Sequence, residues 1–159
     1  MAKQDKGPIP HKRVLTWILV ADGARARILA HEGPGKGLVD AMDHDFVGSK
    51  ERMSDMVSDR PGRTQGSHDS SHHAFGPKTE WHRFEKNQFA KRMAEILEKA
   101  ATQDRFDRLV LVAPPQALGD LRAALGQHAQ KKVTGELDKD LTHVSLSDLG
   151  PHLSDIVRL

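Results

Sequence analysis

The stretch RVLTWILVADGARARILAHEG, residues 13–33, decides the fold. Val14 to Ala21 is a nearly continuous apolar run, whereas Ala24 to His31 alternates more clearly between apolar and polar side chains. A continuous apolar run predicts a strand that is buried on both faces, and hence a central strand. The Asp22-Gly23 pair between the runs favours a type I′ hairpin turn, which needs positive φ. We therefore predict two antiparallel strands joined at this turn.

The residues after this hairpin predict a third strand and a long helix. LVDAMDHDF, residues 38–46, follows the turn GPGKG and alternates like a strand near the edge of a sheet. Residues 80–103 contain no Gly or Pro and place apolar side chains at helical spacing. We expect this helix to begin near Thr79 or Glu80, with Thr79 as its cap and Pro77 marking the boundary before it.

The last third of the chain predicts strands that alternate with helices. FDRLVLVAPP, residues 106–115, indicates a buried strand over 109–113, with Pro115 near the first position of the next helix. That helix, QALGDLRAALG, would have Gly126 as its C-cap. KVTGELDKDL, residues 132–141, indicates a final strand, and residues 142–159 a short helical tail interrupted at Gly150-Pro151. The order β-β-β-α-β-α-β-α predicts an α/β domain with a mixed sheet covered by helices.

The composition fits one soluble domain in a reducing compartment. The chain has 159 residues, a formal net charge of +2 and no cysteine, so disulfides and sulfur-ligated zinc are excluded. Basic residues near the N-terminus are followed only by the short apolar run at 14–20, so we expect no signal peptide and no membrane insertion, and a cytoplasmic protein. We expect a flexible basic tail over 1–13 and a single domain over 14–159, with a long loop at about 48–79.

Four motifs in this order resemble a known family: WILVADGARARIL, SDRPGR, FDRLVLVAPPQALGDLR and GELDKDLTH. They are similar to the bacterial host-attachment proteins, named for proteins required for attachment to host cells, over roughly residues 14–149. That family is in turn similar to the middle domain of eukaryotic and archaeal class 1 peptide-chain release factors. The resemblance implies a ribonuclease H-like sheet with strand order 3-2-1-4-5 and a part in attachment of bacteria to host cells.

The resemblance also gives a place to SDRPGRTQGSHDSSHHAFGPKT, residues 58–79. In release factors the connection between the third strand and the long helix carries a Gly-Gly-Gln tip. Here Gln65 is preceded by Thr64, so that tip is absent and peptide release is not expected. The basic and histidine side chains instead suit an anion or a partner surface. The candidate binding residues are Arg60, Arg63, Gln65, His68, His72, His73 and Lys78.

Two kinds of metal chemistry compete with this interpretation. HDSSHH, residues 68–73, offers imidazoles and a carboxylate that zinc, nickel or copper accept, but His68 and His72 share a face only if the segment is helical. A ribonuclease H-like sheet can also hold divalent ions between carboxylates at strand ends. The residues placed there by the predicted strands are Asp22, Asp107, Asp138 and Asp140. The place of Asp22 in the Asp-Gly turn explains this residue more simply than metal binding does. We therefore assign no metal and no catalytic residue.

The sequence therefore predicts a non-enzymatic binding protein of the host-attachment family, with a direct or indirect role in attachment. The alternative is a ribosome- or RNA-associated, release-factor-like protein that lacks Gly-Gly-Gln. No cofactor is expected. The partner is left open between ribosome or RNA and another protein.

Overall fold

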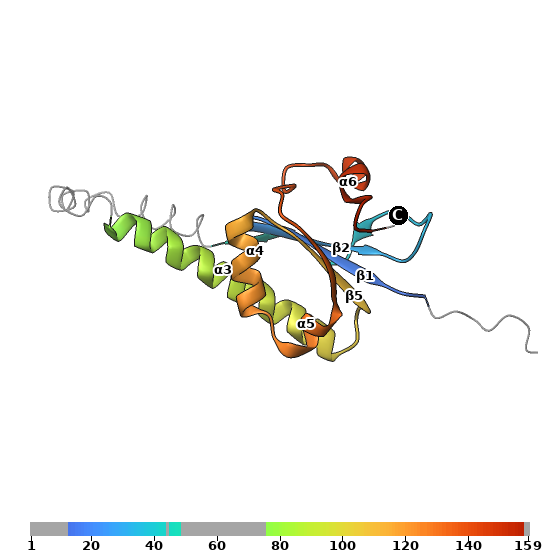
Figure 1. Ribbon diagram of the computed structural model, residues 1–159, viewed down its shortest axis with the longest axis horizontal. Helices are drawn as coiled ribbons and strands as arrows, with labels where there is room; N and C mark the ends of the chain where they lie inside the picture. Colours follow the sequence, from blue (N-terminus) through green and yellow to red (C-terminus); the bar gives the residue numbers. More distant parts are fainter. Residues whose placement is uncertain (1–12, 44, 49–75, 158–159) are drawn as a thin grey trace, which may run out of the picture.

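The computed structural model describes residues 13–43, 45–48 and 76–157. These residues form a mixed α/β fold with one sheet and helices packed on it (Figure 1). The strands are β1 (Thr16–Ala21), β2 (Arg25–His31), β3 (Val39–Asp40), β4 (Phe46–Val47), β5 (Arg108–Val112) and β6 (Val133–Leu137). The helices are α3 (Gly76–Thr102), α4 (Pro115–Ala124), α5 (Gln127–Lys132) and α6 (Leu146–Leu153).

The sheet has the order β3-β2-β1-β5-β6, and β4 also pairs with β2. The β1–β2 pair is antiparallel, whereas β1–β5 and β5–β6 are parallel. Every side chain of β1 is buried because this strand is hydrogen-bonded on both sides and covered on both faces. The predicted mixed sheet and the central position of the first strand are confirmed.

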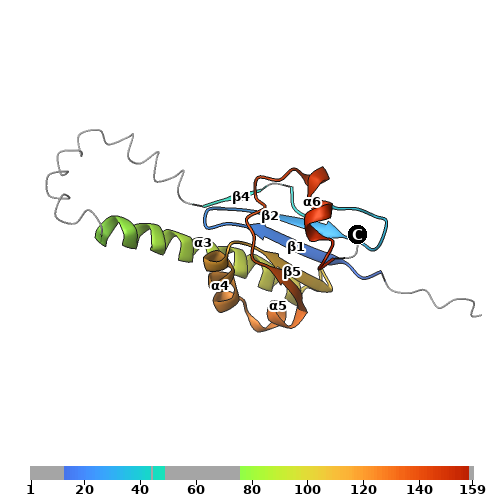
Figure 2. The same cartoon turned by 45° about the horizontal axis from the view of Figure 1, so that its top comes forward.

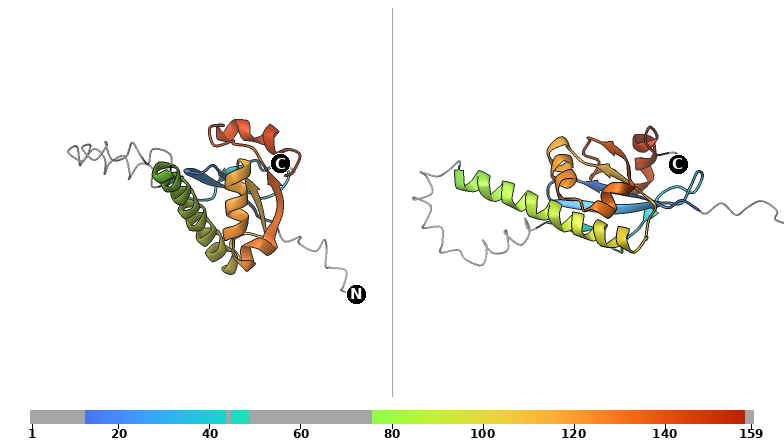
Figure 3. Two further views of the ribbon diagram at one scale, coloured as in Figure 1. Left: turned by 60° about the vertical axis from the view of Figure 1, so that its left-hand side comes forward. Right: turned by 60° about the horizontal axis from the view of Figure 1, so that its bottom comes forward.

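Alternate side chains of β1 enter two separate cores. Trp17 and Leu19 pack with apolar residues of α3, α4 and α5. Ile18 and Val20 pack on the opposite face, where α6 contributes Leu149 and the chain after it contributes Val157. Figure 3 shows the resulting layers, with α3, α4 and α5 on one side of the sheet and α6 on the other. The period-2 geometry of a strand is what divides its residues between the two cores.

The β1–β2 turn contains the predicted Gly23, but both its central pair and its type differ from the prediction. The Asp22 backbone N–H donates to Arg25 O over 2.9 Å, so Gly23 and Ala24 are the two central residues. Gly23 is not among the described glycines with positive φ, which a type I′ turn would require. Aspartate stabilises the turn instead, because Asp22 Oδ1 accepts the backbone N–H of both Ala24 and Arg25 over 2.7 Å.

The predicted edge strand over 38–46 is replaced by two short strands. Val39–Asp40 and Phe46–Val47 pair with different parts of β2, and the Ala41 N–H extends the first pairing by donating to Ile28 O over 2.9 Å. Ala41 and Met42 are sequence neighbours, yet both are partly buried against the core, so this segment does not present one continuous alternating face.

Three helix boundaries also differ from the prediction. The α3 helix begins at Gly76, so Pro77 lies in its first turn, where a missing N–H costs nothing, and Thr79 is inside the helix. Gly126 is the N-cap of α5, and Leu125 is the C-cap of α4. The α6 helix runs through Pro151, because burial of Leu149 and Leu153 compensates for one lost hydrogen bond. Pro115 does begin α4, as predicted.

Within the described residues, no helix is both long enough and apolar enough to cross a lipid bilayer.

Candidate functional site

Most of the residues that the sequence nominated for binding lie outside the described part of the chain. These are Arg60, Arg63, Gln65, His68, His72 and His73. Lys78 is described, and it lies exposed in the first turn of α3. The structure therefore describes the end of the predicted contact loop that leads into α3. The role of this loop in binding stays a prediction.

The segment of α3 that follows Lys78 has an unusual surface. No side chain from 78 to 88 is buried, whereas the helix packs into the core from Phe89 onward. Figure 2 shows the first turns of α3 extending past the sheet. Within this outer segment of α3, residues 78–88, Trp81 and Phe84 are 40% and 50% exposed. Their rings stack on each other with centroids 5.7 Å apart.

The outer segment of α3 is held to the domain by Arg83, and the side chain of Lys86 also lies against Gly23 of the β1–β2 turn. The guanidinium of Arg83 donates to both carboxylate oxygens of Asp120 on α4, over 3.0 and 2.5 Å. Two parallel hydrogen bonds of this kind fix orientation as well as charge. The outer segment, residues 78–88, carries three Lys and Arg side chains against two Glu, a net charge of +1, and Lys91 and Arg92 follow it in the sequence. The exposed aromatic pair therefore lies on a positively charged helix of fixed direction.

A second group of polar side chains lies where the β1–β2 turn meets the segment after β6. Asp22, Asp140 and His143 each bring a potential ligand atom, and these atoms lie within 4.8 Å of one another. Thr142 connects the two segments, because its hydroxyl contacts Asp22 Oδ2 over 3.3 Å and Asp140 Oδ1 over 2.5 Å. The Thr142 backbone N–H also donates to Asp140 Oδ1.

These contacts keep Asp140 charged. Its pKa lies below the usual value, mainly because the Thr142 hydroxyl donates to the carboxylate, with further help from the Thr142 N–H and the nearby His143. Partial burial opposes this shift. Asp140 therefore stays ionised well below neutral pH.

Of the four carboxylates that the sequence placed at strand ends, two come together and two lie elsewhere. Asp22 and Asp140 come together. Asp107 lies at the opposite end of β1 and β5, where its Oδ2 accepts the Leu15 N–H over 2.9 Å. Asp138 is exposed, and it lies outside the cluster. The sequence did not single out His143 or Thr142, although the Asp-x-Thr spacing at 140–142 is a recognisable turn signal.

A small cavity adjoins this cluster. It has a volume of about 170 Å³ and is lined by Arg25, Ala26, Arg27, Asp45, Val47 and Thr142. Pockets for small organic ligands are usually about 300 to 1,000 Å³, so this one suits an ion or a small polar group. Arg27 Nη1 donates to Val144 O over 2.7 Å, while its Nε is buried without a partner among the described residues.

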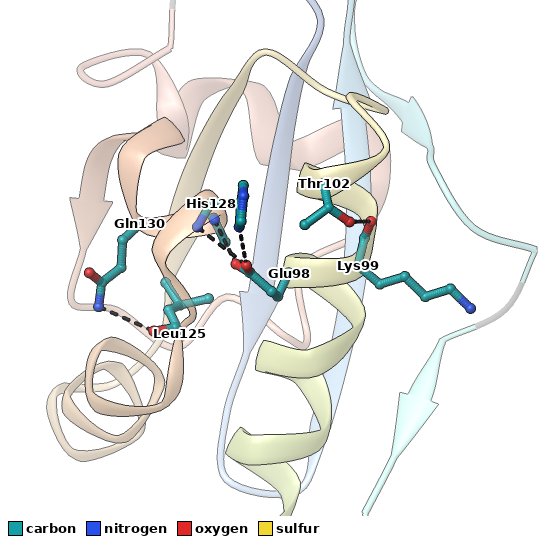
Figure 4. A network of polar contacts seen from close by, with 7 residues as sticks. Glu98, Lys99, Thr102, Leu125, His128 and Gln130 are labelled. Atoms are coloured by element: carbon teal, nitrogen blue, oxygen red, sulfur yellow. Dashed lines mark hydrogen bonds and ion pairs between the residues drawn. The ribbon is translucent and has the colours of Figure 1, made fainter.

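A third polar network is structural. Glu98 of α3 accepts hydrogen bonds from the backbone N–H groups of His128 and Ala129 at the start of α5, and from His128 Nδ1 over 2.6 Å (Figure 4). The carboxylate thus supplies the cap that Gly126, the N-cap residue of α5, has no side chain to provide. The Ala129 N–H is the main cause of the lowered pKa of Glu98, and its two hydrogen bonds from His128 contribute further.

Comparisons with known proteins point to one family. A family model described as "Protein required for attachment to host cells" matches residues 17–153. The comparison with curated proteins gave no match. Among solved structures, the chain is similar to the crystal structure of an archaeal translation termination factor, aRF1, with 13% identity and a TM-score of 0.47. The likeness covers 77% of this chain and 29% of aRF1, so the chain spans less than a third of that structure. Since the family model covers most of the sequence, the chain belongs to the family of proteins required for attachment to host cells.

Proposed function

We propose that this protein is a non-enzymatic binding protein that acts in attachment to host cells, directly or through an intermediate, by docking an acidic protein partner on the outer segment of α3. The stacked and exposed pair Trp81 and Phe84 carries the proposal. Large aromatic side chains are enriched at protein interfaces, where they bury much area at a small cost in side-chain entropy.

The charge of the helix supports an acidic partner. Lys78, Lys86 and Lys91 are exposed on the same stretch of helix, and Arg83 is neutralised by Asp120. Complementary charge accelerates encounter and selects among partners, whereas the aromatic rings provide affinity. We expect binding to weaken as salt rises, because the exposed lysines are screened.

The attachment assay tests this function in cells. Cells that lack the protein are complemented with the wild type, with Trp81→Ser/Phe84→Ser, or with Val39→Ser. Val39 is a matched control, because it is 51% exposed and lies on β3, away from α3. We expect the double variant to fail to restore attachment while Val39→Ser restores it. Restoration by the double variant, at equal protein level and thermal stability, contradicts the proposal.

A ribosome- or RNA-associated role is the second candidate, and the same surface favours it. Exposed aromatic rings flanked by cations also stack on unpaired bases. Co-sedimentation with ribosomes that falls with salt and with Trp81→Ser/Phe84→Ser would support this role over a protein partner. Loss of co-sedimentation in Arg60→Ala/Arg63→Ala instead would assign the contact to the predicted loop residues.

A further inference from the structure

We propose that Asp22, Asp140 and His143 bind one divalent metal ion. The site differs from the docking surface proposed on the outer segment of α3, although the Lys86 side chain of that segment lies against Gly23, next to Asp22. Its residues come from the β1–β2 turn and from the segment after β6, which the fold brings together at one edge of the sheet.

The donor set suits a transition metal. Two carboxylates and one imidazole are ligands that Zn²⁺ and Mn²⁺ both accept. Ligand atoms around such an ion, each at about 2.0 to 2.2 Å, are separated by roughly 3 to 4.4 Å. The observed spread of up to 4.8 Å needs only a small inward movement, which the exposed side chain of His143 can make.

Lone pairs remain for the metal. Asp22 Oδ1 accepts two backbone N–H groups, and Oδ2 accepts only the Thr142 hydroxyl, over 3.3 Å. Both contacts of Thr142 with Asp140 are to Oδ1, so within the described residues Asp140 Oδ2 accepts no hydrogen bond. Thr142 therefore orients both carboxylates while leaving an oxygen of each available. Loss of such a supporting hydrogen bond typically lowers metal affinity by about 10- to 100-fold.

The arginines near the cluster do not neutralise it. Arg27 Nη1 donates to Val144 O over 2.7 Å, and Arg25 and Arg27 line the adjoining cavity together with Asp45. Within the described residues neither arginine forms an ion pair with Asp22 or Asp140, so a bound cation would offset the charge of these two carboxylates.

Mn²⁺ is the probe, because it favours carboxylates over the imidazole-rich segment at 68–73 and broadens nearby NMR signals. We expect the full chain to bind one Mn²⁺, with broadening centred on the Asp22 and Thr142 amides. Asp140→Asn and His143→Gln should each weaken binding by about tenfold or more. Asp138→Asn, an exposed carboxylate outside the cluster, is the matched control and should bind like the wild type.

Two outcomes overturn the proposal. One is broadening centred elsewhere on the chain. The other is wild-type Mn²⁺ affinity in both Asp140→Asn and His143→Gln, with folding verified by circular dichroism.

Discussion

The guanidinium of Arg83 on α3 and the carboxylate of Asp120 on α4 form a two-point ion pair, with Nη2 and Oδ1 2.5 Å apart. Asp120 is the more enclosed partner, with 12% of its side chain exposed against 39% for Arg83. The pair joins the outer segment of α3 to the rest of the domain, and it therefore fixes the direction in which Trp81 and Phe84 are presented.

A double-mutant cycle measures this pair. Arg83→Ala, Asp120→Ala and the double variant should give a coupling of about 1 kcal/mol in urea unfolding, since the geometry is bidentate but partly solvated. Arg83→Lys should recover less than half of it, because an ammonium cannot form the two-point contact. A coupling near zero would mean that the pair does not stabilise the direction of the helix.

Glu98 makes stability depend on pH. Its pKa is lowered in the folded state, chiefly by the hydrogen bond from the Ala129 N–H, so folding favours the carboxylate. The stabilisation is present above the ordinary pKa of glutamate, and it is lost as pH falls through the lowered folded value. Urea midpoints measured from about pH 6 to pH 3 should fall less steeply for Glu98→Gln than for the wild type. Parallel pH profiles would contradict this assignment.

Two glycine substitutions should have opposite signs. A Cβ on Gly126 would lie 2.5 Å from Glu98 Cδ, so Gly126→Ala should displace the carboxylate from α5 and destabilise the protein. Gly126→Ala and Glu98→Gln both weaken the same contact between Glu98 and α5. Adding Glu98→Gln to Gly126→Ala should therefore lower the free energy of unfolding only a little further. Gly119 on α4 has no atom within 4 Å of its Cβ position, so Gly119→Ala should stabilise the protein by about 0.5 to 1 kcal/mol. Thermal and urea unfolding of the variants check these signs.

Asp22 should matter for folding whether or not a metal is present. Asp22→Ala removes the acceptor for two backbone N–H groups in the β1–β2 turn, and we expect a loss of about 1 to 2 kcal/mol in metal-free buffer. Asp138→Ala is the control and should change stability by less than about 0.5 kcal/mol. Equal stability of the two variants would show that the turn does not depend on the carboxylate.

Local sequence patterns gave correct predictions where a single interaction determines the structure. The helical spacing of Phe89, Met93 and Leu97 identified three side chains that are buried against the sheet. The ends of helices were predicted less accurately, because a glycine such as Gly126 can either end α4 or begin α5. The predicted interruption at Pro151 was wrong for a related reason. A proline weakens a helix locally, but the burial of Leu149 and Leu153 keeps α6 helical through this position.

The sequence by itself determined the central strand, the turn at Asp22 and the long helix, because each depends on residues that are neighbours along the chain. Only the tertiary structure decided which polar groups meet. Asp22 and Thr142 are 120 positions apart, and they contact each other because the segment after β6 crosses back to the β1–β2 turn. Arg83 likewise meets Asp120 only because α3 and α4 pack on the same face of the sheet. Hydrophobic periodicity records which face of an element is buried, but not which distant polar side chains the burial brings together.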